Sequence, residues 1–415
     1  MSRILFVSTF TAACLFCLAL GAKAKTFCVS NTAEINAAFS EAETNGENDW
    51  IQVVKGTYSG PFWYSSTEYN PIALLGGYTP SCTSRVIDPP KTILDAGGIG
   101  NVLVIRQFGG GSAHIDGFTI QNGDTSGLTV AVRNTTGIPV QHIHVFNNIV
   151  RGIKNGHGIS IYSSHNSTER PGYVRLKANI IVGNRGSSAG GVIVEAAWGQ
   201  GPGNNVHLAE NIIVGNTSST YGGGAYIDLS QYADVWFSNN TIAENRVLES
   251  GPYAGGVYIN NFGTDNRLGF YNNIIRGNFS ASGVADIKFS DTTPERIGYY
   301  NNYSEMSGTW TSSSRNINID SLFVNRGYWS DNGTPGYYKD DSWVDGDYHL
   351  SKESPCIDEG YNRSPFVYPQ NFDFEGDPRI VDGDNNGSEV VDIGADEYYF
   401  RLGVMPLLQL LLLDD

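Results

Sequence analysis

Residues 179–184 read Asn-Ile-Ile-Val-Gly-Asn, and residues 211–216 repeat this phrase without change. Related phrases follow at 240–245 (Asn-Thr-Ile-Ala-Glu-Asn) and at 273–278 (Asn-Ile-Ile-Arg-Gly-Asn). Self-similarity at a period of this length is typical of solenoids, propellers and repeat arrays. The central apolar residue of each copy, and of two weaker copies upstream, recurs at intervals of 29 to 33 residues: Ile120, Val150, Ile181, Ile213, Ile242 and Ile275.

Each period contains three short runs with strand character, separated by glycine and asparagine. In one copy these runs lie at 191–194, 206–208 and 212–214. Gly and Asn tolerate the left-handed or tight backbone that sharp corners need. The pattern therefore predicts a parallel β-helix with three strands per coil. Pairs of glycines precede the first run in successive copies: 190–191, 223–224 and 255–256.

Other repeat folds fit the sequence less well. No Leu-x-x-Leu-x-Leu frame occurs, and propeller blades need four strands and about 40 residues. The period-2 alternation of β-branched residues excludes helical repeats. We expect an all-β, single-stranded, right-handed parallel β-helix with about eight coils between Leu94 and Tyr303. Its inward positions should form ladders one coil apart: Val192, Ala225 and Val257 in one, and Val194, Ile227 and Ile259 in the next.

Both ends of such a column expose strand edges and need caps. Residues 31–34 read Asn-Thr-Ala-Glu, which is a capping-box start for a helix. This N-terminal helical cap should end at the Asn-Gly pair 45–46, before a first strand at 51–54. The acidic and aromatic segment 321–400 is predicted to form an irregular C-terminal cap. The apolar positions of the helix share one face: Ile35, Phe39 and Ala42.

The first residues predict export. Arg3 precedes an apolar run over 4–20, and small residues stand at Ala22 and Ala24. This pattern is typical of a signal peptide cleaved after Ala24. The alternative is an N-terminal membrane anchor, for which the run is short. The expected organisation is a signal peptide (1–24), an N-terminal cap with the first coil (25–90), the repeats (91–320), the C-terminal cap (321–400) and a short apolar tail (401–415).

Charge and composition exclude several classes of protein. The 42 acidic and 26 basic residues give a net charge of −16, which argues against a nucleic-acid partner. With 40% hydrophobic and 16% charged residues, the chain is neither disordered nor a coiled coil. The apolar run at 407–413 is too short to cross a bilayer, so no transmembrane span is expected in the mature chain.

Export also limits the cysteines to three: Cys28, Cys82 and Cys356. An odd number excludes a disulfide-rich scaffold. Cys28 and Cys82 flank one compact segment and are predicted to form a disulfide in an oxidising compartment. Cys356 is interpreted as a small buried residue rather than as a reactive thiol.

Several phrases resemble one known group of proteins. The chain is similar to bacterial right-handed parallel β-helix repeat proteins of the pectate-lyase-like superfamily, and to the exported group with a choice-of-anchor C-terminal segment. The resemblance implies a secreted or cell-surface protein of the bacterial envelope. It leaves the activity open, because such proteins include lyases, hydrolases and adhesins. The phrases are Asp-Trp-Ile-Gln-Val-Val-Lys-Gly-Thr-Tyr at 49–58, Gly-Gly-Tyr at 76–78 with Cys82, Thr-Ile-Leu-Asp at 92–95, Asp-Tyr-His-Leu at 347–350, Ser-Pro-Cys-Ile-Asp at 354–358 and Asp-Ile-Gly-Ala-Asp-Glu-Tyr at 392–398.

A lyase of this kind needs a basic residue with a lowered pKa, and a cluster of positive charges around that residue lowers its pKa. Lys154, Arg185, Thr217 and Arg246 occupy equivalent positions on successive coils, with His157 close to the first of them. These residues are the catalytic candidates, and a solvated edge is the alternative interpretation. Gly156-His157-Gly158 matches a polygalacturonase motif, but the upstream aspartates of such hydrolases are missing, so the match is treated as coincidence. Whether the protein is an enzyme stays open.

The glycine-led strand suggests a carbohydrate-binding flank. Tyr226 and Tyr258 should point outward one coil apart, with Glu195, Asp228 and Asn260 stacked beside them. Tyr rings and flanking carboxylates suit sugar rings and hydroxyls. A stabilising Tyr ladder is the alternative, and the stacked acids could instead hold a cation. We expect polysaccharide binding along the solenoid flank, with a polysaccharide lyase or a glycoside hydrolase as the alternative function.

An acidic turn near the C-terminus resembles a calcium loop. Oxygen ligands alternate around a glycine turn at Asp382, Asp384, Asn386 and Asp392. The spacing departs from the EF-hand, because its twelfth position is Ile393. A structural Ca²⁺ is therefore expected there, and side chains that point apart into water are the alternative. No organic cofactor is expected.

Overall fold

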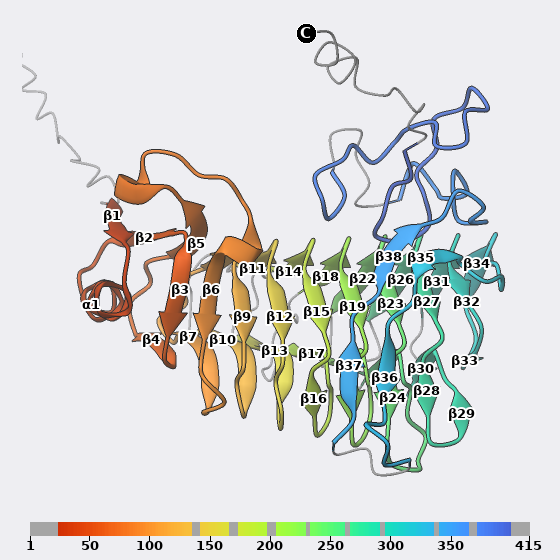
Figure 1. Cartoon of the computed structure of the whole chain (residues 1–415), viewed down its shortest axis with the longest axis horizontal. Helices are drawn as coiled ribbons and strands as arrows, with labels where there is room; N and C mark the ends of the chain where they lie inside the picture. The colour runs from red at the N-terminus through yellow and green to blue at the C-terminus, as the bar shows by residue number, and fades with distance from the viewer. Residues whose placement is uncertain are drawn as a thin grey trace, which may run out of the picture.

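The chain winds as a right-handed parallel β-helix that passes through three long sheets, A, B and C, in each coil (Figure 1). The predicted signal peptide, apart from Ala24, and the tail at 401–415 lie outside the described residues. The computed structural model describes residues 24–134, 142–165, 173–196, 205–229, 233–261, 266–290, 295–335, 340–364 and 372–399.

Strands of each long sheet pair in parallel with the strand one coil away. Sheet A comprises β1 (Ala24–Val29), β2 (Asn48–Val54), β5 (Ile72–Tyr78), β8 (Ala113–Asp116), β11 (His142–Phe146), β14 (Tyr173–Lys177), β18 (Asn205–Ala209), β22 (Asp234–Ser238), β26 (Arg267–Tyr271), β31 (Glu295–Tyr299) and β34 (Ser312–Ser314). Sheet B comprises β3 (Gly56–Ser59), β6 (Thr92–Asp95), β9 (Thr119–Gln121), β12 (Ile149–Arg151), β15 (Ile180–Val182), β19 (Ile212–Val214), β23 (Thr241–Ala243), β27 (Ile274–Arg276) and β32 (Asn302–Tyr303).

Sheet C comprises β4 (Phe62–Ser66), β7 (Asn101–Gln107), β10 (Ser126–Asn134), β13 (His157–His165), β17 (Val192–Ala196), β21 (Ala225–Leu229), β25 (Val257–Asn261), β30 (Ile287–Phe289) and β33 (Met306–Ser307). A short sheet D, which was not predicted, lies at the corner before sheet C and comprises β16 (Arg185–Gly186), β20 (Thr217–Ser218), β24 (Arg246–Val247), β28 (Phe279–Ser280) and β29 (Gly283–Val284). Two small antiparallel sheets follow: β35 (Phe323–Asn325) pairs with β38 (Asp347–Leu350), and the hairpin of β36 (Tyr328–Ser330) with β37 (Ser342–Val344) lies between them in the chain.

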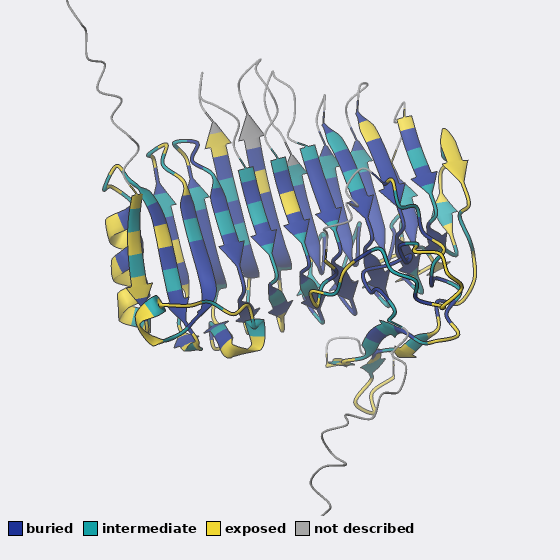
Figure 2. Ribbon diagram, turned by 90° about the horizontal axis from the view of Figure 1, so that it is seen from above, coloured by how far each residue is buried: buried dark blue, intermediate teal, exposed yellow. Residues whose placement is uncertain are grey.

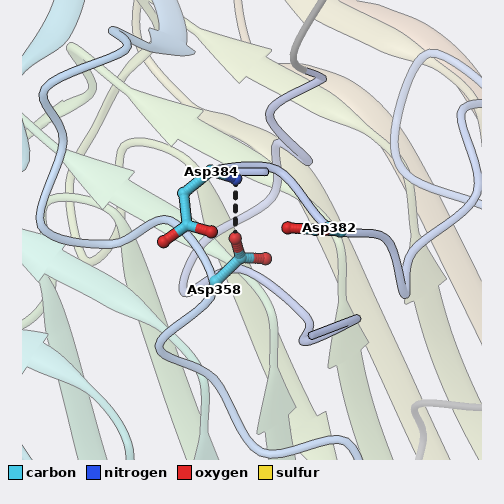
Figure 3. Close-up of side chains that lie close together, drawn as sticks. All are labelled: Asp358, Asp382 and Asp384. Carbon is cyan, nitrogen blue, oxygen red and sulfur yellow. Dashed lines mark hydrogen bonds between the residues drawn. The ribbon is translucent and has the colours of Figure 1, made fainter. Parts of the chain in front are cut away.

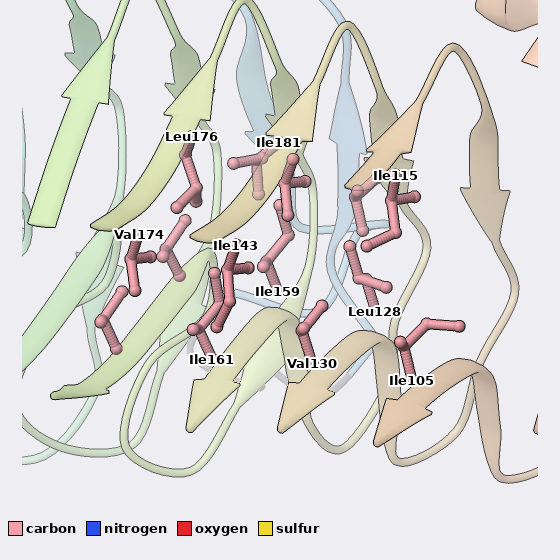
Figure 4. Packing of buried hydrophobic residues seen from close by; sticks show 14 of the residues in the cluster. Ile105, Ile115, Leu128, Val130, Ile143, Ile159, Ile161, Val174, Leu176 and Ile181 are labelled. Atoms are coloured by element: carbon pink, nitrogen blue, oxygen red, sulfur yellow. The ribbon is translucent and has the colours of Figure 1, made fainter. Parts of the chain in front are cut away.

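The core is a column of in-register apolar side chains. Ile181, Ile213 and Ile242 pair one coil apart and are fully buried, as predicted. The two predicted ladders on sheet C are also in register. Figure 4 shows inward residues such as Ile105, Val130 and Ile161 stacked along the column. The repeat thus supplies one layer of core per coil.

Buried asparagines tie each coil to the next. The side-chain oxygen of Asn211 accepts the backbone N–H and the side-chain amide of Asn179 at 3.0 and 2.9 Å. The Asn211 amide in turn donates to the carbonyl of Leu176 at 2.8 Å and to Asn240 at 3.0 Å. The residue directly before a ladder asparagine in the chain has left-handed backbone and forms the corner, as Glu210 does before Asn211 with a φ of 57°. Two ladders of this kind flank sheet B, with members Asn148, Asn179, Asn211, Asn240, Asn273 and Asn301, and Asn184, Asn216, Asn245 and Asn278.

The N-terminal cap is the helix α1 (Thr32–Ala42), followed later by two short 3₁₀ turns, Pro80–Cys82 and Pro89–Lys91. Asn31 accepts the backbone N–H of Glu34, and the predicted apolar face of the helix is buried. The sheet begins earlier than predicted, because Ala24–Val29 pairs with the expected first strand. The predicted disulfide between Cys28 and Cys82 is present. Among the described residues, no helix is long and apolar enough to span a bilayer.

The described residues between 322 and 399 are largely irregular, as predicted, but much of this C-terminal segment covers the outward face of sheet B (Figure 1). Tyr348 and Ala395 pack there against an apolar surface formed by Val182, Ile212, Val214 and Ala243. A Cβ on Gly215 would lie 2.3 Å from the Trp343 ring, so only glycine fits under that ring. The end of the column is covered by Trp310, which packs on Phe270 and Phe289.

Candidate functional site

The outward face of sheet C carries one row of side chains with one member per coil. Successive members lie about 4.8 Å apart, so six of them span roughly 24 Å. Figure 2 shows the alternation along the long strands, in which buried positions face the core and more exposed positions face outward. The register-matched members on β7, β10, β13, β17, β21 and β25 are Arg106, Ala131, Tyr162, Glu195, Asp228 and Asn260.

The row includes the predicted polar residues, but the two predicted tyrosines are less accessible than expected. Tyr226 and Tyr258 pair in register and are each only 7% exposed. The Tyr221 ring stacks on Tyr226 at 4.7 Å between centroids and contacts Tyr258 at 5.4 Å. Their ring faces are therefore occupied by a second aromatic layer. Tyr162, which is 38% exposed, is the tyrosine of the row that is open to a ligand.

Polar contacts link the C-terminal half of the row. The Tyr226 hydroxyl donates to Asp228 at 3.4 Å, and the Asn260 amide donates to Asp228 at 3.3 Å. Burial raises the pKa of Glu195, and the neighbouring Asp228 raises it further. Burial likewise raises the pKa of Asp228. The row therefore offers two adjacent carboxylates whose protonated forms are favoured relative to those in water.

A small hollow adjoins Glu195. Tyr162, Glu195, Phe108 and Arg133 line it, together with strand residues of β10 and β13, and its volume is about 200 Å³. Upstream, the Trp63 ring is 47% exposed and lies 4.2 Å from the Arg106 guanidinium. The face thus combines two aromatic rings, two carboxylates and a cation on strands that the core holds rigidly.

The predicted basic column serves a different purpose. Arg185 and Arg246 occupy equivalent positions two coils apart, as the repeat predicted, with Thr217 on the coil between them. Both guanidiniums lie against the Trp329 ring, at 4.9 and 4.2 Å from its centroid. Arg246 also forms an ion pair with Asp341 at 2.6 Å. These two arginines anchor the β36–β37 hairpin, which covers the position where a substrate would have to reach them.

The remaining catalytic candidates are separate from the carboxylate row. His157 begins β13, and its Nδ1 lies 2.6 Å from the carbonyl oxygen of Ala189. Burial lowers the pKa of His157. Lys154 is exposed at the corner before that strand. Neither residue is brought together with a carboxylate by any contact in the described part of the chain.

The acidic turn brings three carboxylates together, although not the predicted set. Oxygens of Asp358, Asp382 and Asp384 lie within 4.8 Å of one another (Figure 3). Asp358 accepts the backbone N–H of Asp384 at 2.8 Å, and Asp382 accepts that of Asn386 at 2.9 Å. Asp392 stands apart from this group, because it is fully buried and accepts backbone N–H groups at 2.7 Å. Burial raises the pKa of Asp392 to about 8.

Comparison with protein-family models, with curated proteins and with solved structures gives no match to this chain. The functional assignment therefore rests on geometry. Sequence reasoning missed Tyr162 and Arg106, although Tyr162 lies one repeat before Glu195 and extending the ladder upstream would have found it. It also missed Tyr221, which follows no strand periodicity.

Proposed function

We propose that this protein is exported and binds a polysaccharide along the outward face of sheet C. The row from Arg106 to Asn260 carries the proposal, because a linear polymer can meet one side chain per coil. Sugar rings would pack on the exposed rings of Trp63 and Tyr162. Sugar hydroxyls would hydrogen-bond to Glu195 and Asp228, which suits the mixed apolar and polar character of carbohydrate sites.

Export is supported by the disulfide that joins Cys28 to Cys82, since such bonds persist mainly in oxidising compartments. Secretion or display on a bacterial cell surface follows from the signal-peptide pattern and from the sequence resemblance. Membership of the pectate-lyase-like superfamily, and a choice-of-anchor role for the C-terminal segment, stay predictions based on short phrases. The parallel β-helix itself is compatible with both.

The alternative function is cleavage of the bound polymer. It is favoured by one observation: Glu195 and Asp228 are adjacent in register, and burial raises the pKa of each. A carboxyl group with a raised pKa can serve as the general acid of a glycoside hydrolase. A lyase is less well supported, because Arg185 and Arg246 hold the hairpin and are not available as a base.

The test measures binding and cleavage with the same polymers. Purified protein would be titrated with pectate, alginate and chondroitin sulfate, and products followed by absorbance for unsaturated ends and by a reducing-end assay. Tyr162→Ala should weaken binding about fivefold, because an aromatic contact contributes roughly 0.5–1.5 kcal/mol. Tyr328→Ala removes a ring from the β36–β37 hairpin that is still more exposed (60% against 38% for Tyr162), and it should change nothing. Equal affinities of both variants and the parent would contradict the proposed face.

We also propose a structural Ca²⁺ at Asp358, Asp382 and Asp384. Three carboxylates at close range repel one another, and an oxygen-preferring cation would offset that repulsion. The ion would join the acidic turn to the loop that carries Asp358. Its role would be to order the C-terminal segment rather than to act in catalysis.

A further inference from the structure

A hollow of about 430 Å³ lies at the C-terminal end of sheet A, a sheet that the proposed polysaccharide row does not use (Figure 1). Its volume falls in the range of about 300–1,000 Å³ that is typical of ligand pockets. Three parts of the chain meet there: the coils that carry β26 and β31, the edge strand β34, and residues 361–363 of the C-terminal segment. The lining is mainly aromatic and polar: Tyr271, Tyr299, Tyr300, Ser314, Tyr361 and Arg363.

Two strands and one corner place the first three rings. Tyr271 and Tyr299 end register-matched strands and face outward, because Phe270 directly before Tyr271 belongs to the core. The ring centres of Tyr271 and Tyr299 are 5.7 Å apart. Tyr300 follows with left-handed backbone, at a φ of 57°, and its ring stays half-exposed instead of alternating into the core. The adjacent residues Tyr299 and Tyr300 consequently both line the hollow.

The fourth ring belongs to the C-terminal segment and is fixed by the corner of a coil. Asn272 accepts the backbone N–H of Tyr361 at 2.8 Å, and its amide donates to the Tyr361 carbonyl oxygen at 3.3 Å. The Tyr361 ring lies nearly parallel to Tyr300, with 5.3 Å between the ring centres and 12° between the ring planes. Bonds to the main chain therefore position the ring cluster, which is the preorganisation that a binding site needs.

Positive charge borders these rings. Arg363 is exposed and lines the hollow, and the exposed Arg315 carries its guanidinium 5.6 Å from the centre of the Tyr300 ring. Neither guanidinium forms an ion pair with a carboxylate of the described residues. The rim of the hollow is therefore positive, although the chain as a whole carries a net charge of −16.

One acid opposes this positive charge. Burial raises the pKa of Tyr271 to about 12, and the neighbouring Tyr299 and Glu295 contribute to the rise. The Tyr271 hydroxyl therefore keeps its proton and can donate a hydrogen bond at neutral pH. Glu295 lies near enough to act on that hydroxyl through its charge, so it also weakens the binding of an anion in the hollow.

The combination of rings and guanidiniums fits a sugar ring that carries a negative charge. Tyrosine presents an apolar ring that packs on the faces of a sugar and a hydroxyl that can bond to the sugar hydroxyls. A guanidinium binds carboxylate or sulfate oxygens through paired N–H donors. Four tyrosines could also enclose a quaternary ammonium ion, but two guanidiniums beside them repel a cation.

We propose that this hollow binds an anionic sugar unit, with the tyrosines contacting the ring and Arg363 binding its carboxylate or sulfate group. The site is separate from the polysaccharide row, because it uses sheet A and the C-terminal segment rather than sheet C. Tyr361 and Arg363 belong to the C-terminal segment, so the hollow is complete only while that segment is docked. Binding should therefore also protect the segment from limited proteolysis.

The test titrates the mature protein by calorimetry with trimannuronate, its neutral methyl ester, a sulfated galactan trisaccharide and choline. At least one acidic probe should bind, and the comparison of the two acids identifies the preferred anionic group. Arg363→Gln should weaken that binding about tenfold or more, and Tyr361→Ala about twofold to tenfold, with circular dichroism confirming the fold. Arg276→Gln and Tyr328→Ala are the matched controls outside the hollow and should change nothing.

Glu295→Gln should tighten the binding of the acids, whereas the same change would weaken a cation site. The proposal is overturned if neither acid binds, if the methyl ester binds as tightly as trimannuronate, if choline binds in their place, or if the folded Arg363→Gln and Tyr361→Ala variants bind as the parent does. Tyr162→Ala separates the two sites. Loss of binding in that variant alone would place the probe on sheet C, which would overturn the hollow and leave the proposed function standing.

Discussion

Replacing a central ladder asparagine should destabilise the protein far more than replacing an exposed one. Asn211→Ala removes the acceptor of the Asn179 backbone N–H and a donor to the Leu176 carbonyl, both in the buried core. A buried polar group left without its partner costs about 1–3 kcal/mol. Two such groups place the expected loss at roughly 2–6 kcal/mol in the free energy of unfolding.

The matched control is Asn155→Ala, which removes an exposed side-chain bond to Asp124. It should change the free energy of unfolding by less than about 0.5 kcal/mol. Urea denaturation followed by tryptophan fluorescence would give both unfolding midpoints. Equal midpoints for the two variants would refute the idea that the ladder bonds stabilise the coils.

A second substitution tests the direction of the ladder. Asp286 ends the ladder after Asn278, where its carboxylate only accepts hydrogen bonds. Asn211→Asp would place the same acceptor-only group where a donor is also required, and would bury a charge. It should therefore be at least as destabilising as Asn211→Ala, despite its nearly identical shape.

Four further outcomes are expected. Reducing the Cys28–Cys82 bond, which closes a 55-residue loop (82 − 28 + 1), should cost about 4 kcal/mol on the chain-entropy model, and an unfolding midpoint that is insensitive to reductant would contradict this. Arg246→Ala should release the β36–β37 hairpin and speed its cleavage in limited proteolysis. A cleavage rate equal to that of the parent would contradict this anchoring role. Millimolar Ca²⁺ should raise the melting temperature above that in EDTA, and Asp384→Ala should remove the difference; a shift that survives would place the ion elsewhere. Burial opposes protonation of His349, but two hydrogen-bonded carboxylates outweigh burial and raise the pKa of His349 to about 9. The stabilising effect of His349 should therefore be complete below about pH 6.5 and lost as the pH rises through 9. His349→Gln should flatten this pH dependence in thermal melts.

The coils were predictable because their signal is local and repeated. Val192, Ala225 and Val257 stand at the same place in three copies, and the pleat makes such positions face the core together. The role of the asparagines was only partly predictable. Left-handed backbone does occur at Asn239 and Asn272, but the ladder members act through side-chain bonds to residues 28–33 positions away, which no local pattern reports.

The C-terminal segment was expected to cap the end of the column, and its position over sheet B was not predicted, although part of the signal for that position is present in the sequence. Ile180 and Val182 flank the inward Ile181, so both faces of this strand are apolar and both must be covered. The sequence does not indicate which segment covers the outward face of sheet B, because contacts such as Arg246 with Asp341 join residues 95 positions apart and follow no repeat. The burial of Tyr226 by Tyr221 likewise depends on a turn outside the strands.

The C-terminal segment has a consequence for the evolution of this chain. Solenoids commonly gain or lose whole repeats, because each coil contacts only its neighbours. Here one segment is fastened to several coils at once, through Arg151 with Asp345, Arg246 with Asp341 and Asn239 with Asp392. Inserting or deleting a coil between Arg151 and Arg246 would shift one set of anchors by a full step of about 4.8 Å relative to the others. These anchors therefore fit only one number of coils between Arg151 and Arg246, so the C-terminal segment constrains the length of a repeat that could otherwise be extended.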